Sequence, residues 1–352
     1  MEIGTKQHWL AANLRNGAVV ATLASCMVGA GPGRAAPAYT EFDVPGSAGT
    51  YAFAVNDKNA ITGEYDDQDS HEHGFIRNPD ATIITFDGPS ATQTYALAIN
   101  RAGSVVGSYQ VGSAPPHGFL RTAGGTLITL DVPGASQGTY PYAINARGLI
   151  AGYFVDASYI PHGFSRDVNG SITTFDVPNA SGGTYAESVN SKGAIAGEYL
   201  GGDGISHGFL RSADGSMATF DVPTALATTA HGIDDRGAIT GYYTDRNTLE
   251  PAGFLRKPDG QIKIFSTPGT ELTFPLAIAR ERDGSGPCIT GWVKAVNGGD
   301  LGFLRQADGT IATFQAPDAA GGTLAMSISA HGSITGYYYD VGGVGHSFLR
   351  LP

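Results

Sequence analysis

The sequence predicts an all-β protein, a seven-bladed β-propeller with four antiparallel strands per blade, closed into a ring by an N-terminal strand. Three observations predict it. One phrase recurs seven times, each copy has the length of four short strands, and the first strand supplies what the last copy lacks. The composition agrees, because 51 glycines and 19 prolines in 352 residues, with only 15% charged residues, are typical of short strands joined by tight turns.

The repeated unit is clearest in the fourth copy, which has segments at 184–190, 193–199, 207–211 and 216–223. We label its four predicted strands a to d; about 40–45 residues is the usual size of a propeller blade. Three positions recur in every copy and are expected to be structural. They are a phenylalanine (Phe75, Phe119, Phe164, Phe209, Phe254, Phe303, Phe348), an arginine two residues after it, and a strand b glycine (Gly63, Gly107, Gly152, Gly197, Gly241, Gly291, Gly336). We expect the glycine to let neighbouring blades approach near the axis, and the arginine to form an ion pair or to stack.

Closure of the ring follows from the two ends of the repeat array. The seventh copy stops after Arg350 and has no strand d, while a strand d sequence stands alone at residues 39–45. Pairing these two parts would remove the open sheet edges. We therefore expect residues 39–45 to complete the blade of His346, in one domain over residues 39–352.

The repeated phrases, Ile-Asn-x-x-Gly, a lone glycine and His-x-Phe-Leu, resemble the HAF-type extracellular repeat of bacterial secreted proteins. The resemblance covers nearly all of residues 39–352. The chain departs from it by having Gly or Ser where the family name has Ala, and Thr-Phe-Asp-Val-Pro in strand d. The resemblance implies export and a repeated β unit, and it implies no activity or catalytic residue.

Residues 1–38 are expected to be a signal peptide. Lys6 and Arg15 precede an apolar run at residues 17–30 that is too short to span a membrane, and residues 36–38 (APA) fit a cleavage site. The alternative is lipidation at Cys26, in a lipobox-like Leu-Ala-Ser-Cys. Either process predicts a secreted, periplasmic or cell-envelope protein with no transmembrane span.

The net charge of the chain makes some classes of binding partner unfavourable. The chain has 21 basic and 32 acidic residues, a formal net charge of −11. An acidic surface repels nucleic acid and anionic lipid over most of its area, so nucleic acid is not expected as a partner.

Histidine and aspartate recur together across the predicted c–d hairpins. Counting across each hairpin pairs His73 with Asp87, His117 with Asp131, His162 with Asp176, His207 with Asp221, and His346 with Asp43. The fifth and sixth copies lose both members at once. A catalytic dyad has no need of five copies, so we expect structural hydrogen bonds.

A ligand site is expected where the repeats differ, because a ligand has no sevenfold symmetry. One strand a position changes in nearly every copy: Phe53, Leu97, Tyr142, Glu187, His231, Leu276 and Met326. Its mainly apolar composition with one acid and one histidine resembles a small-molecule pocket. The candidates for ligand binding are Glu187, His231, Tyr142 and Phe53. The alternative is that these side chains only pack between blades, with Glu187 and His231 paired.

No cofactor is expected. Asp66, Asp67 and Asp69 could hold Ca²⁺, but their loop lacks the glycine and terminal glutamate of a defined calcium loop, so a solvated acidic loop is the preferred interpretation. The predicted function is a non-catalytic binding module for an extracellular glycan, small molecule or protein. The alternative is a secreted hydrolase or lyase with Glu187 and His231 as acid–base groups at the channel mouth. No catalytic residue is assigned.

Overall fold

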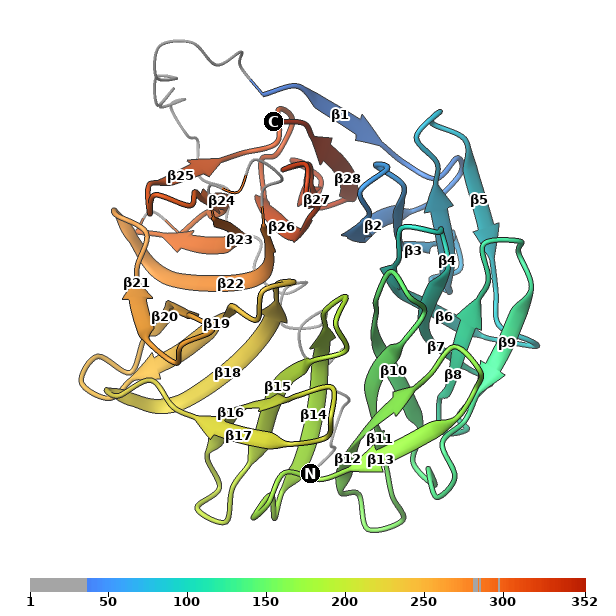
Figure 1. Ribbon diagram of the computed structural model, residues 1–352. Helices are drawn as coiled ribbons and strands as arrows, with labels where there is room; N and C mark the ends of the chain where they lie inside the picture. Colours follow the sequence, from blue (N-terminus) through green and yellow to red (C-terminus); the bar gives the residue numbers. More distant parts are fainter. Residues whose placement is uncertain (1–36, 281–283, 285, 297) are drawn as a thin grey trace.

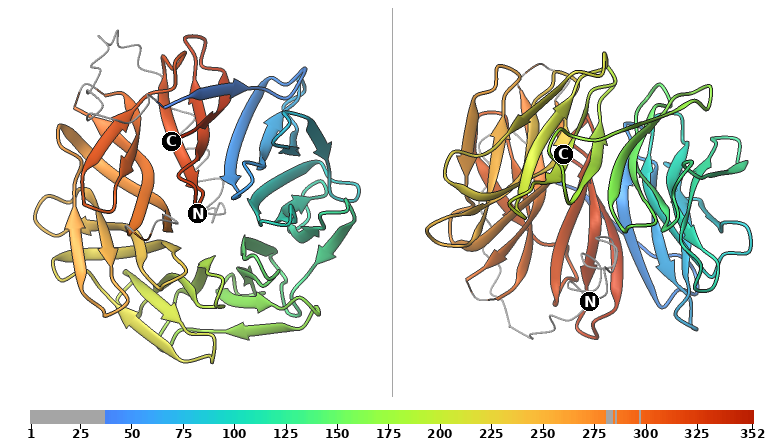
Figure 2. Two further views of the ribbon diagram at one scale, coloured as in Figure 1. Left: turned by 45° about the horizontal axis from the view of Figure 1, so that its top comes forward. Right: turned by 90° about the horizontal axis from the view of Figure 1, so that it is seen from below.

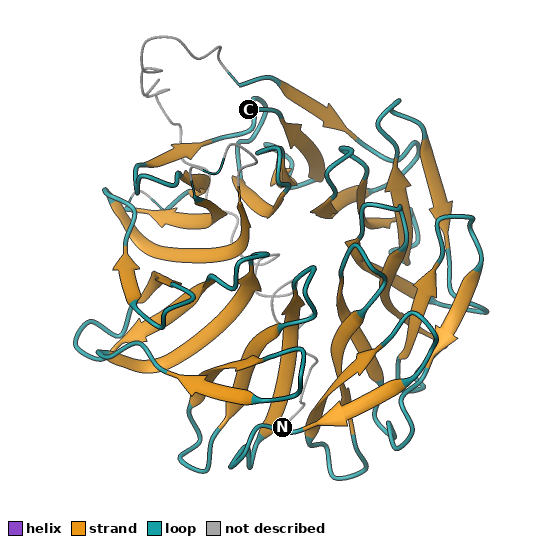
Figure 3. Ribbon diagram, in the orientation of Figure 1, coloured by secondary structure: helices purple, strands orange, loops and turns teal. Residues whose placement is uncertain are grey.

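The predicted fold is confirmed. A computed structural model describes residues 37–280, 284, 286–296 and 298–352, and these contain only strands as regular elements (Figures 1 and 3). The strands form seven four-stranded antiparallel sheets arranged around one axis, and no helix of the described part could cross a membrane. The predicted signal peptide, apart from its last two residues, lies outside the described residues.

Each blade follows the order a, b, c, d from the axis outward. Blades 1 and 2 are β2 (Gly49–Val55), β3 (Ile61–Asp66), β4 (Glu72–Arg77), β5 (Ile83–Phe86), and β6 (Gln93–Ile99), β7 (Val105–Gln110), β8 (His117–Arg121), β9 (Leu127–Leu130). Blades 3 and 4 are β10 (Thr139–Ile144), β11 (Ile150–Val155), β12 (Pro161–Arg166), β13 (Ile172–Phe175), and β14 (Gly183–Val189), β15 (Ile195–Leu200), β16 (Ser206–Arg211), β17 (Met217–Phe220). Blades 5 and 6 are β18 (Ala225–Ile233), β19 (Ile239–Asp245), β20 (Pro251–Arg256), β21 (Ile262–Phe265), and β22 (Thr270–Arg280), β23 (Pro287–Ala295), β24 (Asp300–Arg305), β25 (Ile311–Phe314). Blade 7 is β26 (Gly322–Ile328), β27 (Ile334–Tyr339) and β28 (Gly345–Arg350), with β1 (Tyr39–Phe42) as its fourth strand.

Blade 7 closes the ring as the sequence predicts. β1 pairs antiparallel with β28, with Tyr39 opposite Arg350 and Phe42 opposite Ser347. Figure 1 shows β1 beside β28, between the last blade and the first. The strand ends at Phe42, so residues 43–45 of the predicted segment form the connection to blade 1.

The core lies between blades and is built from the repeated residues. The seven strand c phenylalanines are fully buried. Phe209 packs edge-on against Phe175 of the preceding strand d, and the Arg211 guanidinium lies 4.8 Å above the same ring. Six of the seven repeated arginines stack in this way. For Arg166 the preceding strand d has Leu130 at the corresponding position, so no ring is present.

The structure gives a different reason from the expected one for the glycine in each strand b. In every blade the a–b pairing shifts register by one residue, and in blade 4 the shift lies between Ala186 and Ser188. This β-bulge pushes the strand a backbone toward strand b, so a Cβ at Gly197 would overlap the carbonyl oxygen of Tyr185. Glycine is required by the bulge within each blade, and the expectation of contact between neighbouring blades was wrong on this point.

The two ends of the ring differ in their connections. We call the end with the a–b and c–d turns the turn face, and the end with the b–c and d–a loops the loop face; Figure 2 shows the ring from two further directions. At the turn face the Asn145 side chain accepts hydrogen bonds from the backbone of Arg147 and Leu149 and donates one to the Asn190 carbonyl of the next blade. The same link joins blades 1 to 2, 2 to 3 and 4 to 5. A single repeated asparagine thus shapes the turn and joins blades.

Candidate functional site

The strand a position that varies between blades is the bulge residue itself. The register shifts skip Phe53, Leu97, Tyr142, Glu187, His231, Leu276 and Met326. A bulge re-aims a side chain and is common beside binding sites. These seven residues, which we call the bulge ring, lie on the innermost strands of all seven blades. Six are partly exposed, and Glu187 is buried.

Glu187 and His231 are brought together by adjacent blades. Glu187 Oε2 of β14 contacts His231 Nδ1 of β18. The side chains keep only 5% and 12% of their accessible surface, so their contact is largely shielded from water. The ring of Tyr242 lies against the imidazole, with 5.4 Å between centroids. The sequence placed both residues on neighbouring blades, and the structure shows them paired, as the packing alternative supposed.

Tyrosines surround this pair on its blade 3 and blade 4 side. Burial, and to a smaller extent the negative charge of Glu187, raises the pKa of Tyr142 and of Tyr185. Both hydroxyls therefore stay protonated and can donate hydrogen bonds at physiological pH. Tyr142, a predicted candidate, thus lies within the electrostatic reach of Glu187. Phe53 lies on the far side of the ring, in contact with Tyr337 at 6.4 Å between ring centroids.

Above the bulge ring, toward the loop face, lies a layer of aromatic side chains that the sequence analysis missed. In blades 3, 5 and 7 the residue after the strand b glycine is a tyrosine that packs against strand a of the following blade, as Tyr153 does against Tyr185 and Tyr242 against Phe274, with centroids 5.1 and 5.2 Å apart. In blade 4 this position is Glu198, a buried carboxylate that accepts a 2.7 Å hydrogen bond from Thr229. The signal for this layer was the run of aromatic residues beside the strand b glycine.

The five His–Asp pairs are hydrogen-bonded in the register given by counting across the hairpins. Nδ1 of His73, His117, His162, His207 and His346 lies 2.8–3.0 Å from the paired carboxylate. Each imidazole also stacks on a strand b aromatic ring, as His207 does on Tyr199. These pairs lie at the outer hairpins near the loop face, away from the bulge ring.

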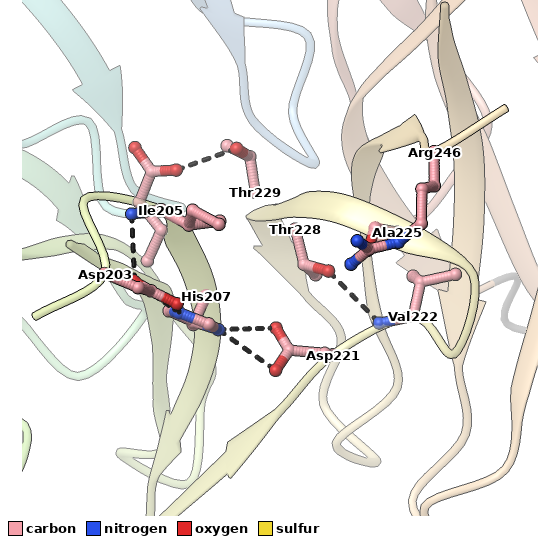
Figure 4. Close-up of polar contacts among 10 residues, drawn as sticks. Asp203, Ile205, His207, Asp221, Val222, Ala225, Thr228, Thr229 and Arg246 are labelled. Atoms are coloured by element: carbon pink, nitrogen blue, oxygen red, sulfur yellow. Dashed lines mark hydrogen bonds and ion pairs between the residues drawn. The ribbon is translucent and has the colours of Figure 1, made fainter. Parts of the chain in front are cut away.

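A second aspartate, also missed, contacts the other nitrogen of four of these histidines. In blade 4 the Asp203 carboxylate is 3.3 Å from His207 Nε2, opposite Asp221 on Nδ1 (Figure 4). Asp67, Asp156 and Asp340 make the same contact in blades 1, 3 and 7, from the first loop residue, where blade 4 has Gly201. Burial lowers the pKa of His207, but hydrogen bonds to Asp221 and Asp203 outweigh it and the net pKa is raised. We call this arrangement the Asp–His–Asp clamp.

The acidic loop of blade 1 is organised by its own backbone. Asp67 accepts hydrogen bonds from the backbone of Asp69 and His71, and the bond from His71 is the main reason that its pKa is lowered to about 2. Its second oxygen faces His73. Among the described residues no group of three or more His, Cys, Asp or Glu side chains is placed to hold a metal ion.

Comparisons with known proteins show the fold and leave the family open. No protein-family model matches the sequence, and no curated protein sequence matches it. A streptogramin B lyase structure superposes over 90% of this chain and 98% of its own, with a TM-score of 0.59 and 16% identity. Virginiamycin B lyase from Staphylococcus aureus gives a TM-score of 0.59 at 17% identity, over 90% of this chain and 100% of its own. An ancestral GH74 enzyme gives 0.54 at 12% identity, over 90% of this chain and half of its own. At this identity the likeness is one of fold.

Proposed function

We propose that the protein is a non-catalytic binding propeller that takes a small molecule or a glycan on its axis, at the bulge ring. The observation that supports this is the contrast between backbone and side chain there. All seven blades form the same bulge, yet its side chain is Phe, Leu, Tyr, Glu, His, Leu or Met. Positions that only pack, such as the strand c phenylalanines, repeat one residue. Variation at a shared, partly exposed position favours contact with a ligand that has no sevenfold symmetry.

The ring has a polar and an apolar half, which describes the ligand. Tyr142, Glu187 and His231 occupy consecutive blades 3 to 5. Leu276, Met326, Phe53 and Leu97 occupy blades 6, 7, 1 and 2. A ligand with hydroxyl or amino groups on one side and an apolar face on the other would satisfy both halves, and pyranose sugars and aromatic natural products have this form.

The alternative is a hydrolase or lyase with its site at the same place. The contact between Glu187 and His231 favours it, because a carboxylate that orients an imidazole is a common acid–base arrangement. Two proteins of similar fold are named lyases, so a propeller of this form can carry such chemistry. The proposal also includes export by residues 1–38 and membership of the HAF-type repeat family.

The test compares three variants of the full chain. Glu187→Gln and His231→Gln replace the carboxylate and the imidazole by amides, while His207→Ala serves as a control on the outer hairpin. An array of immobilised glycans and a thermal-shift screen of small molecules identify a ligand for the parent protein. We expect the first two variants to lose at least about tenfold in affinity, or about 1.4 kcal/mol, and the control to bind like the parent. Turnover of the ligand by the parent, abolished in Glu187→Gln, would favour the enzyme instead. Parent-like binding by both site variants would exclude the bulge ring.

A further inference from the structure

Three positions of each blade make up the bulge ring and the aromatic layer above it. They are the bulge residue, the strand a residue two places before it, and the residue after the strand b glycine. Over the seven blades these positions hold eleven aromatic residues, three glutamates and one histidine, and no lysine or arginine. The described strands a and b have two basic residues, Arg280 and Lys294, which lie at strand ends and contact Asp234 and Asp300. The wall around the axis is therefore aromatic and acidic.

Two of the three glutamates lie on neighbouring strands of blade 4. Glu198 of β15 lies opposite Tyr185, which is two residues before Glu187 on β14. Both glutamates are buried, and both reach β18 of blade 5. Glu187 contacts His231 there, and Glu198 accepts its hydrogen bond from Thr229, two residues earlier on the same strand. The seam between blades 4 and 5 thus holds two carboxylates beside one imidazole.

Tyrosine rings from three consecutive blades lie around these carboxylates. Tyr142, Tyr185 and Tyr242 are all partly exposed. Burial is the main cause that raises the pKa of each hydroxyl, and the negative charge of Glu187 raises each pKa further, so all three lie within its electrostatic reach. The Tyr242 hydroxyl is also hydrogen-bonded to Thr229. The three side chains stay neutral, and the face of a neutral tyrosine ring attracts a cation.

We propose that the ligand on the axis carries a positive charge, an amine or quaternary ammonium group, which binds among Glu187, Glu198 and the tyrosine rings of blades 3 to 5. The inference rests on the proposed function and specifies its class of ligand. A carboxylate supplies the opposite charge, and aromatic faces attract a cation at a place that water reaches poorly. The same carboxylates repel an anion, so acidic sugars and other acids are disfavoured at this half of the ring.

The first test uses two pairs of probes that differ in charge. Choline has a quaternary nitrogen where 3,3-dimethylbutan-1-ol has a carbon atom, and a glucosamine trimer at pH 6 has charged amines where its N-acetylated counterpart has neutral amides. Binding of each probe to the full chain is measured by calorimetry. We expect the charged member of at least one pair to bind at least about tenfold more tightly than the neutral member. A preference confined to choline indicates a free amine, and one confined to the trimer indicates an amino sugar. No preference for charge in either pair would overturn the proposal.

The second test compares two variants that remove the same charge from the same layer. In Glu198→Gln the amide oxygen can still accept the hydrogen bond from Thr229. Glu64 is the buried residue at the corresponding position of blade 1, three blades away, so Glu64→Gln is the control. We expect Glu198→Gln to reduce the preference for the charged probe at least about fivefold and Glu64→Gln to leave it within about twofold of the parent. The preference is a ratio measured within one variant, so a loss of folding lowers both affinities and does not imitate this result. Equal reductions in the two variants would refute a site at blades 3 to 5.

The same measurements separate this inference from the proposed function. If Glu187→Gln and His231→Gln weaken binding of a ligand for which charge makes no difference, the ligand lies on the axis and is neutral, and only the inference fails. If both of these variants bind every probe like the parent, the bulge ring itself is excluded and the proposed function fails with it.

Discussion

Blades 4 and 5 have one backbone plan and hold their loop-face ends differently. Blade 4 has the Asp–His–Asp clamp, with His207 between Asp221 and Asp203. Blade 5 has Ala252 and Ser266 at the paired positions and no clamp. It has a longer inner hairpin instead, since β18 spans nine residues and β19 seven, against seven and six in blade 4.

Blades 4 and 5 together distinguish the structural features that every blade has from those that only some blades have. The bulge, its opposing glycine and the strand c phenylalanine occur in both blades, so they define the blade. The clamp and the lengthened hairpin are two ways of fastening the same end. Blade 6 supports this reading, because it also lacks the histidine and has the longest inner strands, β22 and β23.

We expect the largest loss of stability when the strand b glycine, which both blades share, is substituted. Gly197→Ala would place a methyl group against the carbonyl oxygen of Tyr185, and backbone cannot give way as a flexible side chain can. We expect a loss of more than about 3 kcal/mol in the free energy of unfolding, and the same from Gly241→Ala in blade 5. Urea unfolding followed by fluorescence measures both. A mild effect in either blade would show that the bulge does not dictate the glycine.

The Asp–His–Asp clamp should contribute less to the free energy of unfolding than the strand b glycine does, and only in the blades that have it. His207→Ala removes a charge-assisted hydrogen bond and a ring stacked on Tyr199, but Asp221 is half exposed and regains water. We expect a loss of about 1–2 kcal/mol. The double variant with Asp221→Ser, which imitates blade 5, should cost less than the two single changes added together. Strict additivity in this double-mutant cycle would mean that the pair does not interact.

Introducing the His–Asp pair of blade 4 into blade 5 tests whether the pair stabilises a blade that lacks it. Ala252 lies opposite Tyr243, as His207 lies opposite Tyr199, so a histidine there has a ring to stack on. Ala252→His with Ser266→Asp should raise the free energy of unfolding by up to about 1 kcal/mol. Each single change alone should give no gain. A destabilised double variant would show that the longer hairpin and the clamp exclude each other.

The smallest effect is a dependence of the clamp on pH. The pKa of His207 is raised in the folded protein, so its stabilisation is complete below the unfolded value near 6.5 and is lost as pH rises through the folded value. The pKa of Asp203 is lowered, mainly by the Ile205 backbone and then by His207, so its share is lost only in acid. The stability difference between the parent and His207→Ala should therefore be larger at pH 5.5 than at pH 8.5. A difference that grows toward pH 8.5 would contradict the assigned charge state.

The sequence was sufficient for the features that depend on spacing. Copy number, closure by β1 and the pairing of His207 with Asp221 all follow from counting, because hairpin register is fixed by a short turn. The reason for Gly197 could not be found this way, since a bulge is a shift of register that leaves no mark on residue spacing. Asp203 was overlooked because it is the third residue of its loop, whereas the equivalent aspartates of blades 1, 3 and 7 are the first residue, where blade 4 has Gly201. The contact between Glu187 and His231 required the relative placement of two blades.

Closure by β1 also sets an order in time. Six blades pair only strands that follow one another along the chain, so each can form as soon as its own segment is available. The seventh must wait for Arg350 to meet Tyr39. Until then β28 and β1 both present open edges, which is the period of greatest exposure to mispairing. The free-energy cost of this wait is small, because closing such a long loop costs only about 2 kcal/mol more than closing a loop of one blade. Closing the ring by pairing β1 with β28 therefore delays folding more than it reduces stability.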